Sequence, residues 1–304
     1  MVRGIETKVQ TYEGMQRSEN RTLILMLVPC VVILFLTTVA PLMHLLYTST
    51  LDWNLTKPFA KEFYGIGNYV WMFTDDEFYD AVGVALQLIF ESVFLQIVLG
   101  IALAELLAVD FKGKNLLRTL FIFPMVIPPV VAAVLWRIMY NPRAGLFSYF
   151  LGLLGFDVAM LGSSETALHA IVIVEVWQYT PFVLLMFMAA YSVIPEELYE
   201  AADIDGAGWW GKFCHITLPA IRPMIIVAVL FRVIGTIKVF PTILITTHGG
   251  PGTSTTTVNF YTYIKAFEQA EVGYSSAVGV FMFVMVIATI MVIRYMAKFL
   301  GGTE

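Results

Sequence analysis

Long apolar blocks recur along this chain of 304 residues and limit it to a small set of folds. A block of about 20 apolar residues is long enough to cross roughly 30 Å of hydrocarbon as an α-helix. Charged residues make up only 13% of the chain, well below the share of about 25% in ordinary soluble domains. We therefore predict an all-α, polytopic membrane protein with six transmembrane helices. The predicted spans are residues 23–46, 82–109, 116–138, 167–191, 221–245 and 275–298.

The first block could also be a cleavable signal peptide, because Arg17 and Arg21 precede it. It is longer than the apolar core of a signal peptide and lacks a small-x-small cleavage site. We therefore expect a retained span. Because a lipid-embedded backbone must satisfy its hydrogen bonds internally, and because the blocks do not alternate in polarity, we expect helices rather than a barrel.

The positive residues that flank the spans predict the orientation of the chain. With the N-terminus inside, eleven fall on the inner side and five on the outer side, so we expect both termini in the cytoplasm. The inner residues are Arg3, Lys8, Arg17, Arg21, Lys112, Lys114, Arg118, Lys212, Arg222, Arg294 and Lys298. The outer residues are Lys57, Lys61, Arg137, Arg143 and Lys265.

Three parts follow from this layout. We predict a cytoplasmic tail over residues 1–20, a first transmembrane helix with an outer loop over 21–80, and the main transmembrane domain over 81–299. A cytoplasmic loop over residues 192–220 interrupts the main domain between its fourth and fifth spans.

The sequence lacks the motifs of a self-contained enzyme. It has no GxxxxGK[ST] phosphate loop, no HExxH and no CxxC, and its four histidines are scattered. We therefore predict no catalytic residues and no metal site. If the chain moves a solute uphill, the energy must come from a partner chain or from an ion gradient.

The loop over residues 192–220 predicts a short helix. Pro195 suits a first helical turn, Glu196 and Glu197 complement its positive end, and Gly206 and Gly208 can end it. A helix of about ten residues is marginal alone in water, so it must dock against something. One alternative is an amphipathic helix on the bilayer surface, although its acidic residues disfavour an anionic leaflet.

The same loop carries a spaced motif. Glu200, Ala201 and Ala202 are followed after three residues by Gly206, after nine more by Ile216, and then by Leu218-Pro219. This pattern resembles the EAA loop of binding-protein-dependent ABC importer permeases. The resemblance implies the type I ABC importer transmembrane fold and a coupling helix that seats in a separate ATPase subunit. The residues it assigns to ATPase coupling are Glu200, Ala201, Ala202, Asp203, Gly206, Ile216, Leu218 and Pro219.

A second stretch, "THGGPGTSTTTVNFYTYIKAFEQAEVGYSSAVG", resembles the GGP loop of the carbohydrate-uptake branch, in particular the larger maltose-permease-type subunit. In this chain Pro241 follows Phe240, and Gly235-Thr236 stands upstream, where many relatives carry acidic residues. These positions lie on the expected substrate path, so the sequence leaves open which sugar is carried.

The resemblance also implies a location in the cell (inner) membrane and a set of partners. These are a second homologous permease subunit in a heterodimer, two cytoplasmic ATP-binding subunits, an extracytoplasmic sugar-binding protein, a sugar substrate and membrane lipid, with no nucleic acid. ATP and Mg²⁺ are expected on the ATPase subunits, and no cofactor is expected on this chain.

Charged residues inside the spans mark a candidate substrate pathway, because such residues are costly in lipid. The candidates are Glu91, Glu175, Arg232, Lys238 and the aromatic Phe240. We expect Arg232 to pair with one of the two glutamates, both of which we place about a third of the way in from the outer face. The same charges suggest an alternative, an ion-coupled secondary transporter. A membrane scaffold without a transport role would leave the EAA spacing to chance.

Overall fold

The computed structural model describes residues 26–57, 59–156 and 158–299, and within them long apolar helices dominate. Five are long enough to span a membrane, and a bent pair makes a sixth candidate, which confirms the predicted fold class. The five are Met26–Thr48, α4 (Asp76–Ala108), α8 (Ala167–Tyr191), Trp209–Ile237 and Val272–Met296, the last within α14 (Val272–Phe299). The predicted tail 1–20, the start of the first span and four inner basic residues lie outside the described residues.

The third span is not the single straight helix that we predicted for residues 116–138. It consists of α5 (Lys114–Val126) and α6 (Pro129–Met139), which meet at an angle of 101°. The physical reason is the pair Pro128-Pro129, because a residue before proline is pushed out of the α region. Ile127 and Pro128 accordingly have extended backbones, with ψ of 127° and 140°.

The fifth span is shifted from its predicted position at 221–245. Its helix runs over Trp209–Ile237 and comprises α10 (Trp209–Lys212), η2 (Phe213–Thr217) and α11 (Leu218–Ile237). The predicted loop over 192–220 is therefore helical in its second half. Beyond Ile237 the chain breaks and resumes as α12 (Pro241–Thr246), because Pro241 disfavours a helical Phe240, whose φ is −138°.

Two π-helical segments each end two positions before a proline. The segment η2 precedes Pro219, and η1 (Phe35–Val39) precedes Pro41 at the start of α2 (Ala40–Thr48). Proline lacks an N–H group and its ring collides with the carbonyl four residues earlier. A wider turn relieves this conflict and lets both helices continue through their prolines.

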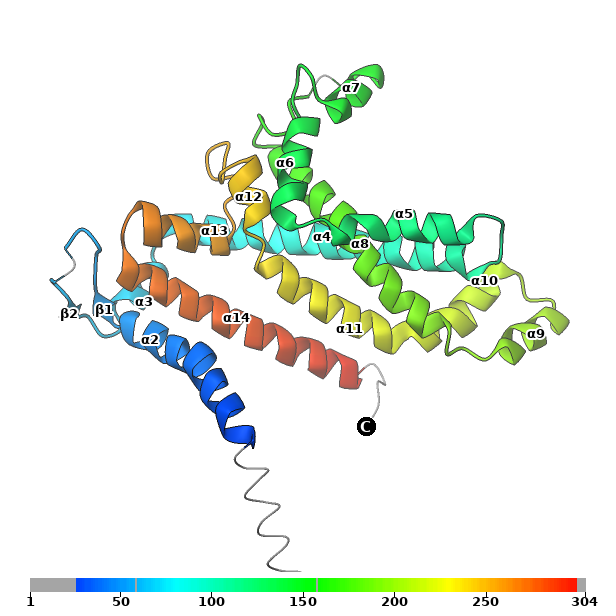
Figure 1. Cartoon of the computed structure of the whole chain (residues 1–304), viewed down its shortest axis with the longest axis horizontal. Coiled ribbons are helices and arrows are strands. Elements are labelled where there is room, and N and C mark those ends of the chain that lie inside the picture. Colours follow the sequence, from blue (N-terminus) through cyan, green and yellow to red (C-terminus); the bar gives the residue numbers. More distant parts are fainter. Residues whose placement is uncertain (1–25, 58, 157, 300–304) are drawn as a thin grey trace, which may run out of the picture.

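The helices α4, α11 and α14 run roughly along the long axis of the molecule, and different small elements lie at its two ends (Figure 1). At one end lie β1 (Leu51–Asp52), β2 (Glu62–Phe63) and α3 (Gly67–Met72). At the other end lies α9 (Glu196–Ile204). The helices α6, α7 (Leu146–Leu153) and α12 project to one side of the long helices. The segments α13 (Val258–Tyr263) and η3 (Ile264–Glu268) lead into α14.

A polar cluster holds the β1–α3 end to the C-terminal half. The Asp75 carboxylate accepts hydrogen bonds from the hydroxyls of Tyr261 and Tyr274, and Lys265 lies 3.9 Å away. Although partial burial raises the pKa of Asp75, these hydrogen bonds and the Lys265 charge outweigh it and hold the pKa below its usual range.

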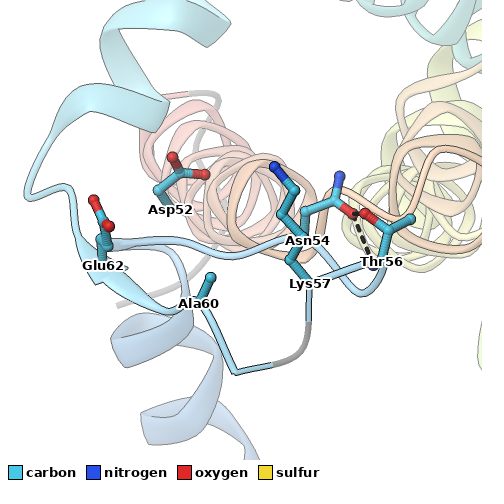
Figure 2. Close-up of a pocket in the computed structure, with 6 residues that line it drawn as sticks. All are labelled: Asp52, Asn54, Thr56, Lys57, Ala60 and Glu62. Carbon is cyan, nitrogen blue, oxygen red and sulfur yellow. Dashed lines mark hydrogen bonds between the residues drawn. The ribbon is translucent and has the colours of Figure 1, made fainter.

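Nearby, the β1–β2 connection forms a polar hollow (Figure 2). Asp52 and Glu62 face each other in the strand register, and Asn54 accepts a hydrogen bond from the Thr56 amide. The lining is completed by Lys57 and Ala60.

Close packing of α4 on α8 depends on Gly100. A β-carbon there would lie 2.6 Å from a methyl of Val183, which is fully buried. We expect Gly100→Val to lower the free energy of unfolding by about 1–3 kcal/mol, the usual cost of overpacking a core. Denaturant titration in mixed micelles measures this. Gly83→Val is the matched control on the same helix, since nothing lies within 4 Å of its added β-carbon. Equal losses in both variants would refute the packing explanation.

Candidate functional site

The first candidate site is the short helix α9, which has nine residues and buries none of them. Pro195 is its N-cap, with an extended backbone, and so lies one position before the first turn in which the sequence places it. Glu196 and Glu197 occupy the first turn, as predicted. Ile204 is 88% exposed, which is unusual for so large an apolar side chain. A short helix with an exposed apolar residue requires a partner surface for its stability.

Gly206 ends α9 in a left-handed conformation, with φ of +73°. The Ala207 amide donates to the Ala202 carbonyl at 2.9 Å, and the Gly206 amide donates to the Asp203 carbonyl at 3.1 Å. These two bonds form a Schellman motif, which satisfies carbonyls that the helix end leaves free. The spacing from the EAA triplet to Gly206 thus has a local structural reason, and the prediction that Gly206 can end the helix is confirmed.

Side-chain contacts fix α9 against the start of the fifth span. Asp203 forms an ion pair with Lys212 in α10, and the Tyr199 hydroxyl lies 2.9 Å from the Thr217 hydroxyl in η2. The other motif residues share two settings. Glu200 and Ala201 are exposed on α9, whereas Ile216, Leu218 and Pro219 lie in η2 and the first turn of α11.

Three aromatic rings mark the beginning of α10. Trp209 and Trp210 stack with ring centroids 4.9 Å apart, and Phe213 lies 5.5 Å from each of them. Both tryptophans are about two-thirds exposed, at 60% and 65%. Such a group at the start of a spanning helix is typical of the membrane–water interface.

The second candidate site is a buried polar cluster around Arg232 on α11. The predicted pairing of Arg232 with a glutamate is confirmed, because its Nη2 lies 3.6 Å from Oε2 of Glu175. Only 5% of Arg232 and 1% of Glu175 are exposed. The Arg232 Nε donates to Gln96 at 2.7 Å, and the guanidinium lies over the ring of Tyr179 at 4.1 Å. The charge is therefore enclosed by polar and aromatic partners, as an intramembrane arginine requires.

Glu91 does not join this cluster. Its carboxylate lies 2.8 Å from Nδ1 of His169 and accepts a hydrogen bond from Gln87. Since His169 is near the start of α8 and Glu175 lies six residues further along, Glu175 is about 9 Å deeper. The expectation of equal depth for the two glutamates is wrong.

Lys238 and Phe240 lie at the break between α11 and α12 rather than inside a spanning helix. Lys238 is exposed, and no ion pair of its side chain occurs among the residues that the structure describes. Phe240 is half-buried, with its ring centroid 5.0 Å from that of Tyr263. The structure thus brings Arg232 and Glu175 together and leaves Glu91, Lys238 and Phe240 outside their cluster.

Sequence reasoning missed three members of the buried cluster. Gln96 donates to the Glu175 carbonyl at 3.0 Å, and Thr242 donates to the Glu175 carboxylate at 3.3 Å. The third member is Tyr179, which stacks on Arg232. Gln96 could have been found, because it is a lone polar residue inside an apolar run and such residues are costly in lipid unless paired. Thr242 carries no comparable signal.

The chain has relatives of known family. Residues 96–301 match the family described as binding-protein-dependent transport system inner membrane component. The chain is 35% identical over 276 residues to the trehalose/maltose transport system permease protein MalF of Thermococcus litoralis, covering 90% of this chain and 93% of the relative. It is 34% identical over 298 residues to the trehalose transport system permease protein SugA of Mycobacterium tuberculosis H37Rv, covering 97% and 95%.

A solved structure resembles the fold along most of its length. A chain of a bacterial ABC transporter involved in the import of the acidic polysaccharide alginate superposes with a TM-score of 0.82. It covers 93% of this chain and 97% of its own length at 24% sequence identity. Identity at that level establishes a shared fold and nothing more specific.

Proposed function

The chain belongs to the family of binding-protein-dependent transport system inner membrane components, and from this premise we propose that it is one permease subunit of an ATP-driven sugar importer. It forms half of the translocation pathway and couples to a separate ATPase subunit through α9. Sugar-system permeases among its relatives support this assignment. The family membership favours the importer over the ion-coupled alternative.

The geometry of α9 is the main support for this assignment. It is a nine-residue helix with no buried residue, ended by a left-handed glycine and held to the fifth span by Asp203–Lys212 and Tyr199–Thr217. A helix that is fixed to a spanning helix on one side and exposed on the other can bind a partner and transmit the partner's movement to that spanning helix. The residues that we assign to the ATPase contact are Glu200, Ala201, Ala202, Asp203, Gly206, Ile216, Leu218 and Pro219.

The remaining partners follow from the same assignment. The complex comprises a second homologous permease, two cytoplasmic subunits that bind ATP and Mg²⁺, and an extracytoplasmic sugar-binding protein. The α9 end of the molecule faces the cytoplasm of a cell whose inner membrane holds the chain, and both termini lie on that side. ATP-driven closure can shift the pathway between inward and outward access only by its differential binding energy for the two states.

Glu91, Glu175, Arg232, Lys238 and Phe240 are our candidates for residues along the substrate pathway. Because Arg232 and Glu175 are both enclosed, we assign them to the support of its wall rather than to direct contact with the sugar. Lys238 and Phe240 stand at a break in the fifth span, where irregular backbone is tolerated if it lines a cavity.

Reconstitution tests the proposed function. We expect the purified chain alone to show no sugar uptake in proteoliposomes, with or without a proton gradient. The full complex with its loaded binding protein takes up sugar only when ATP is present on the ATPase side. Uptake by the single chain driven by a proton gradient would establish the ion-coupled alternative instead.

A further inference from the structure

One turn of α8 contacts the breaks of both interrupted spans. Nε2 of Gln178 donates to the carbonyl of Ile127 at 2.9 Å, at the break between α5 and α6. Glu175 accepts from Thr242 in α12 and pairs with Arg232 in α11, on the two sides of the other break. Glu175 and Gln178 are three residues apart and therefore lie on the same face of α8. This one face contacts both breaks.

Both α8 side chains are almost fully enclosed, with 1% of each residue exposed. The Ile127 carbonyl lies where two prolines interrupt the helical hydrogen bonds. A backbone carbonyl at such a break needs a hydrogen-bond donor from outside its own helix. A membrane interior offers no water that could act as this donor. Gln178 supplies that donor, so its hydrogen bond is a requirement of the bend.

The helices beyond the two breaks lie together. Nη1 of Arg137 in α6 donates to the carbonyl of Ile245 in α12 at 3.1 Å. Figure 1 shows α6 and α12 projecting side by side from the long helices. The helices α6 and α12 are thus joined to each other, and α8 forms hydrogen bonds at the break that precedes each of them.

We propose that Gln178 is a positioning residue for transport: together with Glu175 it holds both interrupted spans to α8, so that α6 and α12 follow α8 as one unit when the pathway changes access. The inference rests on the importer function proposed above and deepens it. Gln178 acts through the backbone of the α5–α6 break and needs no contact with the sugar.

The first test uses the complete importer complex with Gln178→Leu, which keeps the side-chain bulk and removes the donor. We expect the maximal rate of sugar uptake to fall roughly tenfold, the effect of one lost hydrogen bond. ATP hydrolysis stimulated by the loaded binding protein should stay near the wild-type rate, and the half-saturating sugar concentration should not change. Gln178→His retains a donor and should recover uptake. Gln269→Leu, at an exposed site outside the spans, is the matched control.

A parallel loss of uptake, ATP hydrolysis and complex yield in Gln178→Leu would overturn the proposal, because it would indicate a merely structural role. Uptake that remains at the wild-type level would also overturn it.

The second test does not depend on sugar transport. Cys30 and Cys214 are replaced by serine, and spin labels are placed at the exposed positions Ile138 in α6 and Leu116 in α5. We expect a single narrow distance distribution for the wild-type bend and a broadened one with Gln178→Leu. Identical distributions would show that Gln178 does not hold the bend. If the complex failed to transport sugar at all, the proposed function would fail while this measurement still judged the positioning role.

Discussion

Replacing Gly206 by valine in the assembled importer is expected to abolish sugar-stimulated ATP hydrolysis while leaving the spanning helices inserted. The φ of +73° at Gly206 is a conformation that residues with a β-carbon disfavour, and β-branched residues most of all. Forcing a non-glycine residue into such a region costs on the order of 1–3 kcal/mol. A cost of one or two kcal/mol lowers the population of a conformation by a factor of about 5–30. The native conformation of α9, to which the ATPase subunit binds, would then be only weakly populated.

Two matched variants separate backbone conformation from bulk. Gly206→Asn should retain most of the coupling, because asparagine tolerates the left-handed region. Gly208→Val places the same side chain two residues further on, where φ is −70° and nothing lies within 4 Å of the added β-carbon. Both should keep ATP hydrolysis coupled to uptake. Normal coupling in Gly206→Val would leave the coupling role of α9 without support.

The second large effect is expected at the buried pair. Arg232→Met leaves Glu175 enclosed without its cation, and breaking one partner of a buried ion pair typically costs about 3–5 kcal/mol. We expect a loss of that size in the free energy of unfolding measured in mixed micelles. Sugar uptake should be lost as well, because the Thr242 contact at the α11–α12 break depends on the same carboxylate.

The double variant Arg232→Met with Glu175→Leu tells a structural pair from a functional one. Replacing both charges by apolar residues of similar size removes the unpaired charge, so stability should return to near the wild-type value. If the pair also shapes the pathway, uptake stays low in the stable double variant. If uptake returns together with stability, the pair is structural only, and Arg232 and Glu175 are not pathway residues.

Much of this fold could be predicted from the sequence, because the length of an apolar block and the position of a proline determine the structure of their own segment. The six apolar blocks predict the number of spans, and Pro195 with Gly206 predicts both ends of α9. Pro128-Pro129 equally indicates a break, but the hydropathy of residues 116–138 is continuous through the bend and by itself predicts a straight span. The early end of the fifth span at Ile237 follows from Pro241 in the same way.

The buried clusters depend on contacts between distant segments, which no local pattern encodes. Arg232 needed an acidic partner, and the sequence offered both Glu91 and Glu175 at similar expected depths. Arg232 pairs with Glu175 because of the way in which α8 packs against α11. Glu91 pairs with His169 instead because of the way in which α4 packs against α8. Gln178 reaches Ile127 across 51 residues of sequence, so its role could be inferred only from the fold.

Photo-crosslinking from α9 measures directly whether this helix contacts the ATPase subunit. A benzophenone amino acid replaces Ile204, which is 88% exposed on α9, and in a second chain replaces Phe59, which is 99% exposed near β2 at the opposite end. Irradiation of each assembled complex, followed by mass spectrometry of the adducts, reports what each end touches. We predict adducts between position 204 and the ATPase subunit, and no ATPase adducts from position 59. An importer that takes up sugar with ATP yet yields no ATPase adduct from position 204 would contradict the assignment of α9 as the coupling helix.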